Sequence, residues 1–117
     1  LESLKKTNPK RKIISVFQPH RYSRLRMLKE EFSSSFKYSD ILLLCPVYSA
    51  GEKIDKNYNE KDFAKLISRN SGIQVILVKN QQDLNKFFKK NLLNNEVIIG
   101  MGAGVISKWM TNIKYSL

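Results

Sequence analysis

The chain alternates short apolar runs with longer segments in which apolar residues recur every three or four positions. Continuous apolar runs rich in β-branched residues predict strands, and the three-to-four spacing predicts helices with one buried face. The predicted strands cover 13–17, 41–44, 73–78 and 97–99. The predicted helices carry apolar residues at 25–36, 63–67, 84–88 and 106–113, after a short helical segment at 1–6.

Fully apolar strands that alternate with helices are typical of a parallel sheet covered on both faces. We therefore predict an α/β fold of three layers, a Rossmann-like, mostly parallel sheet with helices on both faces. The length of 117 residues suits a single domain and is too short for two. Asn59 and Asn80 precede two of the predicted helices and are expected to cap them.

The longest unbroken apolar run, residues 41–45, is far shorter than the roughly 20 residues that a membrane-spanning helix needs. We expect neither a membrane span nor a signal peptide. Cys45 lies inside this run and is the one cysteine of the sequence. It is expected to be a small buried hydrophobic residue in a protein of the reducing cytoplasm.

The charge is strongly biased, because 21 Lys and Arg against 10 Asp and Glu give a net charge of +11. Such a charge suggests an anionic partner such as nucleic acid, a nucleotide or a phosphorylated metabolite. A base-composition bias in the coding DNA would also produce scattered lysines. A basic nucleic-acid-binding module stays open as an alternative, although the sequence has neither an aromatic RNA-binding motif nor a Cys/His finger.

Polar and glycine-rich loops follow three of the predicted strands, at 18–24, 48–52 and 100–104. Ligands of parallel α/β sheets bind beyond the carboxyl ends of the strands, so these three loops are expected to meet on one rim. The glycines of the third loop do not form a dinucleotide fingerprint, because position 105 is Val. They are either a tight turn or a backbone surface that approaches a ligand. The sequence also contains no phosphate-binding P-loop motif.

The first loop holds the most informative side chains. Ser23 is expected to cap a helix, which places Arg24 in its first turn beside the positive end of the helix dipole. Arg21 and Arg24 have no obvious local partner, so with free helix N–H groups they are expected to form a clamp for a carboxylate or a phosphate. The alternative is that both are solvated surface residues. His20 is the one histidine, and it is either a hydrogen-bonded loop residue or a donor to a substrate carboxylate. No second ligand accompanies it, so no metal site is expected.

Three segments together resemble a known family: VFQPHRYSR at 16–24, VYSAGE at 47–52 and MGAG at 101–104. They are similar to the C-terminal domain of the UDP-N-acetylmuramate:L-alanine ligases, which are Mur ligases of peptidoglycan synthesis. Pro46 departs from the acidic residue that this family often has before Val-Tyr. The resemblance implies that residues 1–117 are one domain of a three-domain cytoplasmic enzyme, with the start of this domain lying before residue 1. The C-terminal domain of another Mur-type amide ligase is the related alternative.

The resemblance also implies a reaction and a set of site residues. In the family, ATP with Mg²⁺ phosphorylates the carboxylate of UDP-N-acetylmuramate, and the amine of L-alanine then attacks the acyl phosphate. An N-terminal domain holds the UDP-sugar, and a central domain holds most of the ATP and Mg²⁺ contacts. His20, Arg21 and Arg24 match the residues that hold the alanine carboxylate. The expected cleft-lining residues are Tyr22, Tyr48, Gly51, Glu52, Gly102 and Gly104.

Two further expectations concern this chain alone. It should have no ligase or ATPase activity, because the phosphate loop and the UDP-sugar domain are absent from the sequence. The loop from Tyr48 to Tyr58 should be mobile and make few packed contacts, because the partner domains are absent from the sequence. The sequence assigns no oligomeric state.

Overall fold

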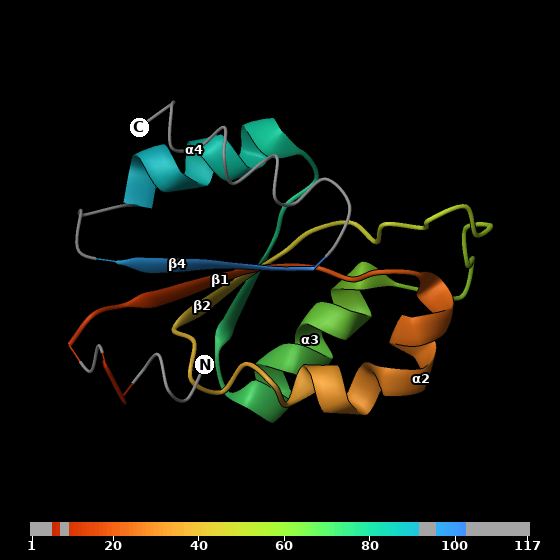
Figure 1. Ribbon diagram of the computed structural model, residues 1–117, viewed down its shortest axis with the longest axis horizontal. Coiled ribbons are helices and arrows are strands. Elements are labelled where there is room, and N and C mark those ends of the chain that lie inside the picture. Colours follow the sequence, from red (N-terminus) through yellow and green to blue (C-terminus); the bar gives the residue numbers. More distant parts are fainter. Residues whose placement is uncertain (1–5, 8–9, 92–95, 103–117) are drawn as a thin grey trace.

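The computed structural model describes residues 6–7, 10–91 and 96–102 (Figure 1). Its four strands are β1 (Ile13–Gln18), β2 (Ile41–Leu44), β3 (Gln74–Leu77) and β4 (Val97–Gly102). They form one sheet in the order β3-β2-β1-β4, and every neighbouring pair is parallel. The helices between them are α2 (Tyr22–Ser33), α3 (Glu60–Ser71) and α4 (Gln81–Asn91).

Helices cover both faces of this sheet, as the apolar strands predict. Figure 1 shows α2 and α3 on one face and α4 on the other. Side chains of β2 alternate between the two sides: Leu42 and Leu44 pack with α2 and α3, and Leu43 packs with α4. The three-layer α/β fold expected from the sequence is confirmed for the described part of the chain.

The two cores have different helix partners. On one face Phe17, Leu25, Phe63 and Ile67 pack together, and all are at most 6% exposed. On the other face Leu84 and Phe88 of α4 are fully buried against the sheet. Burial of these large side chains is the main stabilising contribution to the sheet that carries the site.

The expected asparagine caps are confirmed. Asn59 Oδ1 accepts a hydrogen bond from Asp62 N at 3.1 Å, and Asn80 Oδ1 accepts one from Asp83 N at 2.9 Å. Each bond satisfies an N–H group of a helix start that has no partner within its helix. Gly72 ends α3 in the left-handed conformation, with φ of 68°.

Three expectations about the elements are wrong. Ser23 is not a cap, because α2 already begins at Tyr22 and Arg21 precedes it with φ of 66°. The fourth strand continues to Gly102, so residues 100–102 pair with β1 and do not form a loop. Phe36 lies beyond the end of α2, although it is buried in the same core as expected.

Two further expected features lie outside the described residues, namely the helix at 106–113 and almost all of the helical segment at 1–6. Among the helices that are described, none combines the length and the apolar character needed to cross a membrane.

Candidate functional site

The direction in which successive strands are added to the sheet reverses at β1. The chain passes from β1 to β2 and then β3 on one side, and returns through α4 to place β4 on the other side of β1. The carboxyl ends of β1 and β4 therefore form a topological switch point, where open α/β sheets bind their ligands. A hollow of about 320 Å³ lies there, which we call the switch-point hollow. It is lined by Phe17, Gln18, His20, Arg24, Phe32 and Gly102.

Gly102 makes the close approach of β1 and β4 possible. It pairs with Gln18, and a Cβ placed on it would lie 2.3 Å from the Gln18 carbonyl oxygen. Its φ of 131° is also one that other residues rarely adopt. Of the two glycines predicted to line the cleft from the third loop, Gly102 does so and Gly104 lies outside the described residues.

The loop after β1, residues 18–24, and the loop after β2, residues 48–52, are joined by backbone hydrogen bonds. Tyr48 N donates to Pro19 O at 2.9 Å, and Arg21 N donates to Tyr48 O at 2.7 Å. His20 and Tyr48 face each other across this parallel bridge, and their rings stack with centroids 5.6 Å apart and planes 12° apart. The imidazole of His20 is thus held at the rim with one face covered by a tyrosine ring.

Arg21 and Arg24 extend from the start of α2, and both are exposed. A second hollow of about 400 Å³, the arginine hollow, is lined by His20, Arg21, Ser23, Arg24, Met27 and Leu28. His20 and Arg24 line both hollows, so the two are adjacent. The expected grouping of His20, Arg21 and Arg24 at the carboxyl-end rim is therefore what the structure has.

Arg21 is placed by an uncommon backbone conformation. Its φ of 66° is positive, which costs free energy for a residue with a Cβ. The hydrogen bond from its N–H to Tyr48 stabilises that conformation and turns the chain sharply into α2. Strain of this kind is retained where the position of a side chain matters, and here it sets the start of the helix that carries both arginines.

Glu52 supplies the cap that Ser23 was expected to supply. Its Oε2 accepts a 2.6 Å hydrogen bond from Ser23 Oγ, and its Oε1 accepts one from Ser23 N at 3.3 Å. The hydrogen bond from the Ser23 hydroxyl is the main cause that lowers the pKa of Glu52, with backbone N–H groups of α2 and the charge of Arg21 adding to it.

This contact corrects the expected clamp. The first N–H groups of α2 were expected to be free for a ligand, but the Glu52 carboxylate takes up that position. A ligand carboxylate would therefore meet guanidinium groups and not the helix end. The sequence carries one signal of this arrangement: the first turn of α2 has no acidic residue of its own, so an acidic residue from a neighbouring loop is left to complement the dipole.

The other residues expected to line the cleft do not lie together. Tyr22 is not among the residues that line the switch-point hollow. It lines a separate hollow with Tyr58, and their rings meet edge to face at 5.7 Å. Gly51 is exposed with φ of 89° and makes the turn before Glu52. The expectation of few packed contacts between Tyr48 and Tyr58 is wrong for the end of this loop, where Tyr58 packs against Phe63 of the core, and is confirmed for its middle, where Ile54 is 75% exposed.

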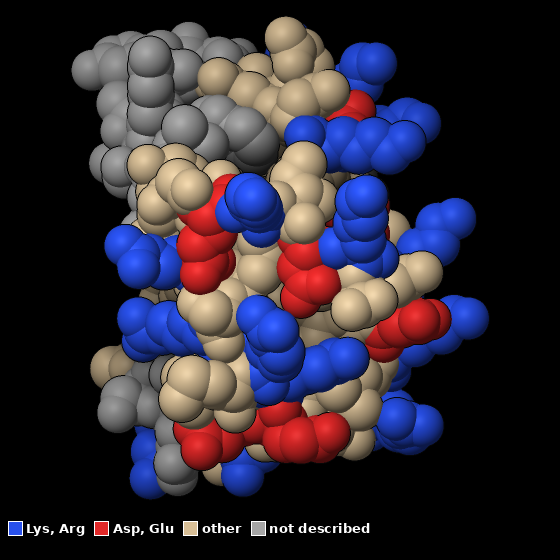
Figure 2. Space-filling view, turned by 90° about the vertical axis from the view of Figure 1, so that its right-hand side faces the viewer, with Lys and Arg blue, Asp and Glu red and all other residues tan. Residues whose placement is uncertain are grey.

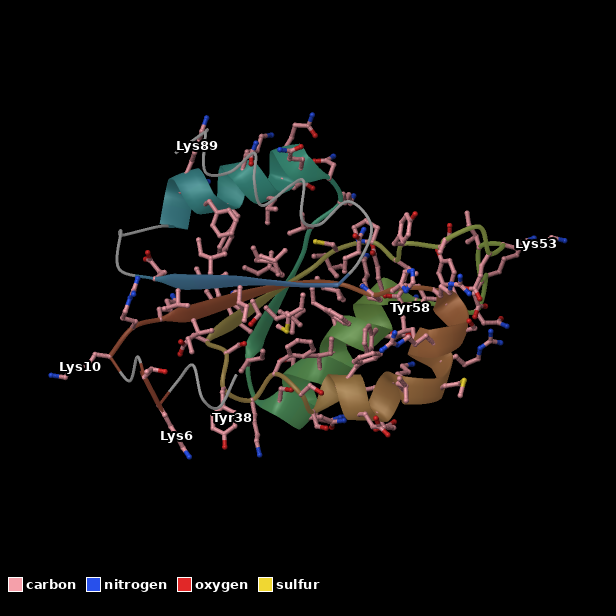
Figure 3. The ribbon with its side chains drawn as sticks, in the orientation of Figure 1. Lys6, Lys10, Tyr38, Lys53, Tyr58 and Lys89 are labelled. Carbon is pink, nitrogen blue, oxygen red and sulfur yellow. The ribbon has the colours of Figure 1, made fainter. Side chains whose placement is uncertain are left out.

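The positive charge is dispersed over the molecule. Figure 2 looks onto the side of the molecule where the strands of Figure 1 end, and basic side chains there are interspersed with acidic ones. In Figure 3, Lys6 and Lys10 lie at the opposite end of the molecule from Lys53, and Lys89 lies on the outer side of α4. The face seen in Figure 2 is therefore not a continuous basic surface of the kind that a nucleic-acid backbone requires.

Comparison with known proteins gives relatives along most of the chain, although no family model matches it. The chain is 48% identical over 101 residues to the UDP-N-acetylmuramate–L-alanine ligase of Pelagibacter ubique, covering 86% of the chain and 22% of that protein. The enzyme of the same name from Ruthia magnifica is 36% identical over 105 residues, covering 90% of the chain and 22% of the relative. The chain belongs to the Mur ligase family.

This Mur ligase chain matches a part of each relative and spans about a fifth of their length. A third enzyme of that name, from Vesicomyosocius okutanii, is 32% identical over 115 residues, covering 98% of the chain and 24% of the relative. These partial matches are consistent with the C-terminal domain that the motifs indicated, and they do not favour the nucleic-acid-binding alternative.

A solved structure supports the fold. A murein peptide ligase from Psychrobacter arcticus superposes with a TM-score of 0.70 at 12% sequence identity, over 98% of this chain and 23% of the other. At that identity the similarity establishes the fold.

Proposed function

We propose that this chain is the C-terminal domain of an ATP-dependent ligase that joins L-alanine to UDP-N-acetylmuramate in peptidoglycan precursor synthesis. The names of the relatives support the reaction, and their partial coverage supports the assignment to one domain. The observation that carries the proposal is the grouping of His20, Arg21 and Arg24 around two adjacent hollows at the switch point. The role of the domain is to position the amino acid and to close over the active site.

Each of these side chains has a definite part in the proposal. Arg21 and Arg24 bind the carboxylate of L-alanine, since a guanidinium group donates two parallel hydrogen bonds to a carboxylate. His20 donates to the same carboxylate, with its ring held by the stacking contact to Tyr48. Holding the amino acid in one orientation directs its amine toward the activated carboxylate and lowers the entropic part of the barrier.

Other parts of the reaction belong to residues outside this chain in the proposal. The sequence has no P-loop. The described residues contain no group of three or more His, Cys, Asp or Glu side chains that could hold a metal ion. We therefore assign none of them to ATP or Mg²⁺ and derive no step through either. The chain by itself is expected to release no phosphate from ATP when UDP-N-acetylmuramate and L-alanine are supplied, and such release would contradict the proposal.

The proposed partners follow from the reaction. They are UDP-N-acetylmuramate, L-alanine and ATP bound by the complete enzyme, which we place in the cytoplasm, where the nucleotide substrates are made. Nucleic acid and membrane have no part in the proposal.

The arginines give the test. In the full-length ligase, Arg24→Ala or Arg21→Ala should raise the KM for L-alanine by roughly thirtyfold, as expected when a charged hydrogen bond of about 2 kcal/mol is lost. The KM for ATP should change little. Arg69→Ala is the matched control, because it removes an exposed arginine from the last turn of α3, remote from the rim.

The outcomes separate the alternatives. An unchanged KM for L-alanine in both variants would contradict the proposed role of the arginines. A wild-type enzyme that uses a peptide in preference to L-alanine would assign the chain to another Mur-type amide ligase.

A further inference from the structure

Tyr48 meets the site through another side chain. Its N–H donates to Pro19 O and its carbonyl oxygen accepts from Arg21 N, on either side of His20. Its ring lies parallel to the imidazole of His20, with centroids 5.6 Å apart and planes 12° apart. Tyr48 is not among the residues that line the switch-point hollow or the arginine hollow, whereas His20 lines both. Any effect of the Tyr48 ring on a ligand in these hollows must therefore pass through the imidazole.

The backbone of His20 is fixed, but its side chain is oriented by one contact. The two hydrogen bonds to Tyr48 hold the peptide groups before and after His20, and Pro19 is fully buried. The torsion that turns a histidine ring is broad, so a fixed backbone does not by itself fix the plane of the imidazole. Among the described residues, no hydrogen bond or ion pair orients this imidazole. The parallel ring of Tyr48 is the contact that restricts its rotation.

The ring of Tyr48, and not its hydroxyl, makes this contact. The side chain is 38% exposed, and its hydroxyl has no hydrogen-bond partner in the part of the chain that the structure describes. A flat aromatic ring against a flat imidazole opposes rotation of the imidazole, because rotation loses the parallel contact. The stacked ring covers a face of the imidazole, while the ring nitrogens lie in its edge. An N–H group of His20 therefore stays available to a ligand.

We propose that Tyr48 is a positioning residue for L-alanine, whose ring holds the imidazole of His20 in the plane from which it donates to the carboxylate of the amino acid. This rests on the proposed function. It replaces the expected role of Tyr48, direct lining of the cleft, by an action through a second side chain. A donor that is already oriented loses less entropy when the amino acid binds. The effect is on binding, so the KM for L-alanine should change without a matching change in kcat.

The first experiment removes the ring and leaves the backbone bridge in place. In the full-length ligase, Tyr48→Ala should raise the KM for L-alanine about threefold to tenfold, the range that an aromatic pair contributes. The kcat and the KM for ATP should change by less than about twofold. Tyr48→Phe keeps the ring without the hydroxyl and should have the wild-type KM for L-alanine. Tyr38→Ala is the matched control, because Tyr38 is a half-buried tyrosine before β2, at the end of the molecule opposite the rim (Figure 3).

A double-mutant cycle separates positioning of the imidazole from a structural role of the loop. His20→Ala removes the group through which Tyr48 acts, so adding Tyr48→Ala to it should change the KM for L-alanine by less than about twofold. The same increase of the KM with and without the imidazole would overturn the proposal, because Tyr48 would then act on Arg21 or on its own loop. An unchanged KM in Tyr48→Ala would also overturn it. So would a KM in Tyr48→Phe that rises as much as in Tyr48→Ala.

A further variant keeps the test informative if Tyr48→Ala does not fold. Tyr48→Leu retains apolar volume at the same place but has no flat face. It should raise the KM for L-alanine by about threefold and have no effect in the His20→Ala background. A wild-type KM in Tyr48→Leu would contradict the need for a stacked ring.

Failure of this proposal is distinguishable from failure of the proposed function. If His20→Ala raises the KM for L-alanine and Tyr48→Ala does not, the amino-acid site stands and the role of Tyr48 is wrong. If Arg24→Ala raises the KM and His20→Ala does not, the imidazole has no part in binding, and the role of Tyr48 is wrong for that reason. If neither His20→Ala nor Arg24→Ala raises the KM, the proposed amino-acid site itself is wrong.

Discussion

Replacement of Gly102 by alanine tests whether the close approach of β1 and β4 is required for stability. An added Cβ would lie 2.3 Å from the carbonyl oxygen of Gln18, and Gly102 has φ of 131°. The backbone conformation alone costs about 1 to 3 kcal/mol for a residue with a Cβ. Relief of the overlap requires the two strand ends to separate by roughly 1 Å, which weakens their last hydrogen bonds. We expect Gly102→Ala to lower the free energy of unfolding by about 3 kcal/mol or more.

Gly72→Ala is the control, since it shares the positive φ without the overlap. Gly72 has φ of 68°, and an added Cβ would meet nothing within 4 Å. Its substitution should cost about 1 to 2 kcal/mol, the penalty of the left-handed conformation. The difference between the two variants therefore isolates the contact with Gln18.

Urea unfolding of the wild type and both variants, with a common slope, measures these free energies. The reasoning predicts that Gly102→Ala is the less stable variant by about 2 kcal/mol. A Gly102→Ala variant as stable as Gly72→Ala would refute it, and would mean that β4 does not approach β1 as the structure has it.

Two further predictions concern Glu52 and Cys45. The pKa of Glu52 is lower in the folded chain than its ordinary value of 4.5, so the contact with Ser23 stabilises the fold above that pH and is lost as the pH falls below it. Glu52→Gln should therefore lower the free energy of unfolding at pH 7 and make that free energy fall less between pH 5 and 3. Unfolding measured at a series of pH values checks this. Free energies of unfolding that fall in parallel with pH for wild type and variant would contradict it. Burial raises the pKa of Cys45 to about 12, so a thiol reagent at pH 8 should label it slowly in the native chain and rapidly in denaturant. Rapid labelling without denaturant would contradict its burial.

The contact between Glu52 and Ser23 also bears on the site. It connects the loop after β2 to the helix that carries both arginines, and the His20 and Tyr48 bridge connects the same loop to β1. The backbone that carries Arg21 and Arg24 is thus held by two contacts, while both arginine side chains remain exposed. Positioning through such supporting contacts is what substrate orientation requires.

The sequence by itself determined the elements and the edge of the sheet where the site lies. Hydrophobic periodicity located β2 at Ile41–Leu44, and the short range of capping contacts made Asn59 and Asn80 recognisable. The rule that ligands of parallel sheets bind beyond the strand ends predicts His20 and Arg24 at one rim, and both line the switch-point hollow there. Each of these inferences depends on residues within about one helical turn of each other, or on a rule that holds for every fold of the class.

Only the tertiary structure decided the contacts that depend on which strands are neighbours. That β4 lies beside β1 makes Gly102 a residue of the sheet and places it against Gln18. That Glu52, and not Ser23, completes the start of α2 follows from the joining of two loops 29 residues apart. The physical reason is that such pairings are selected by the packing of the whole sheet. Local propensity sets the elements, but the free energy that chooses among their arrangements comes from burial shared across the chain.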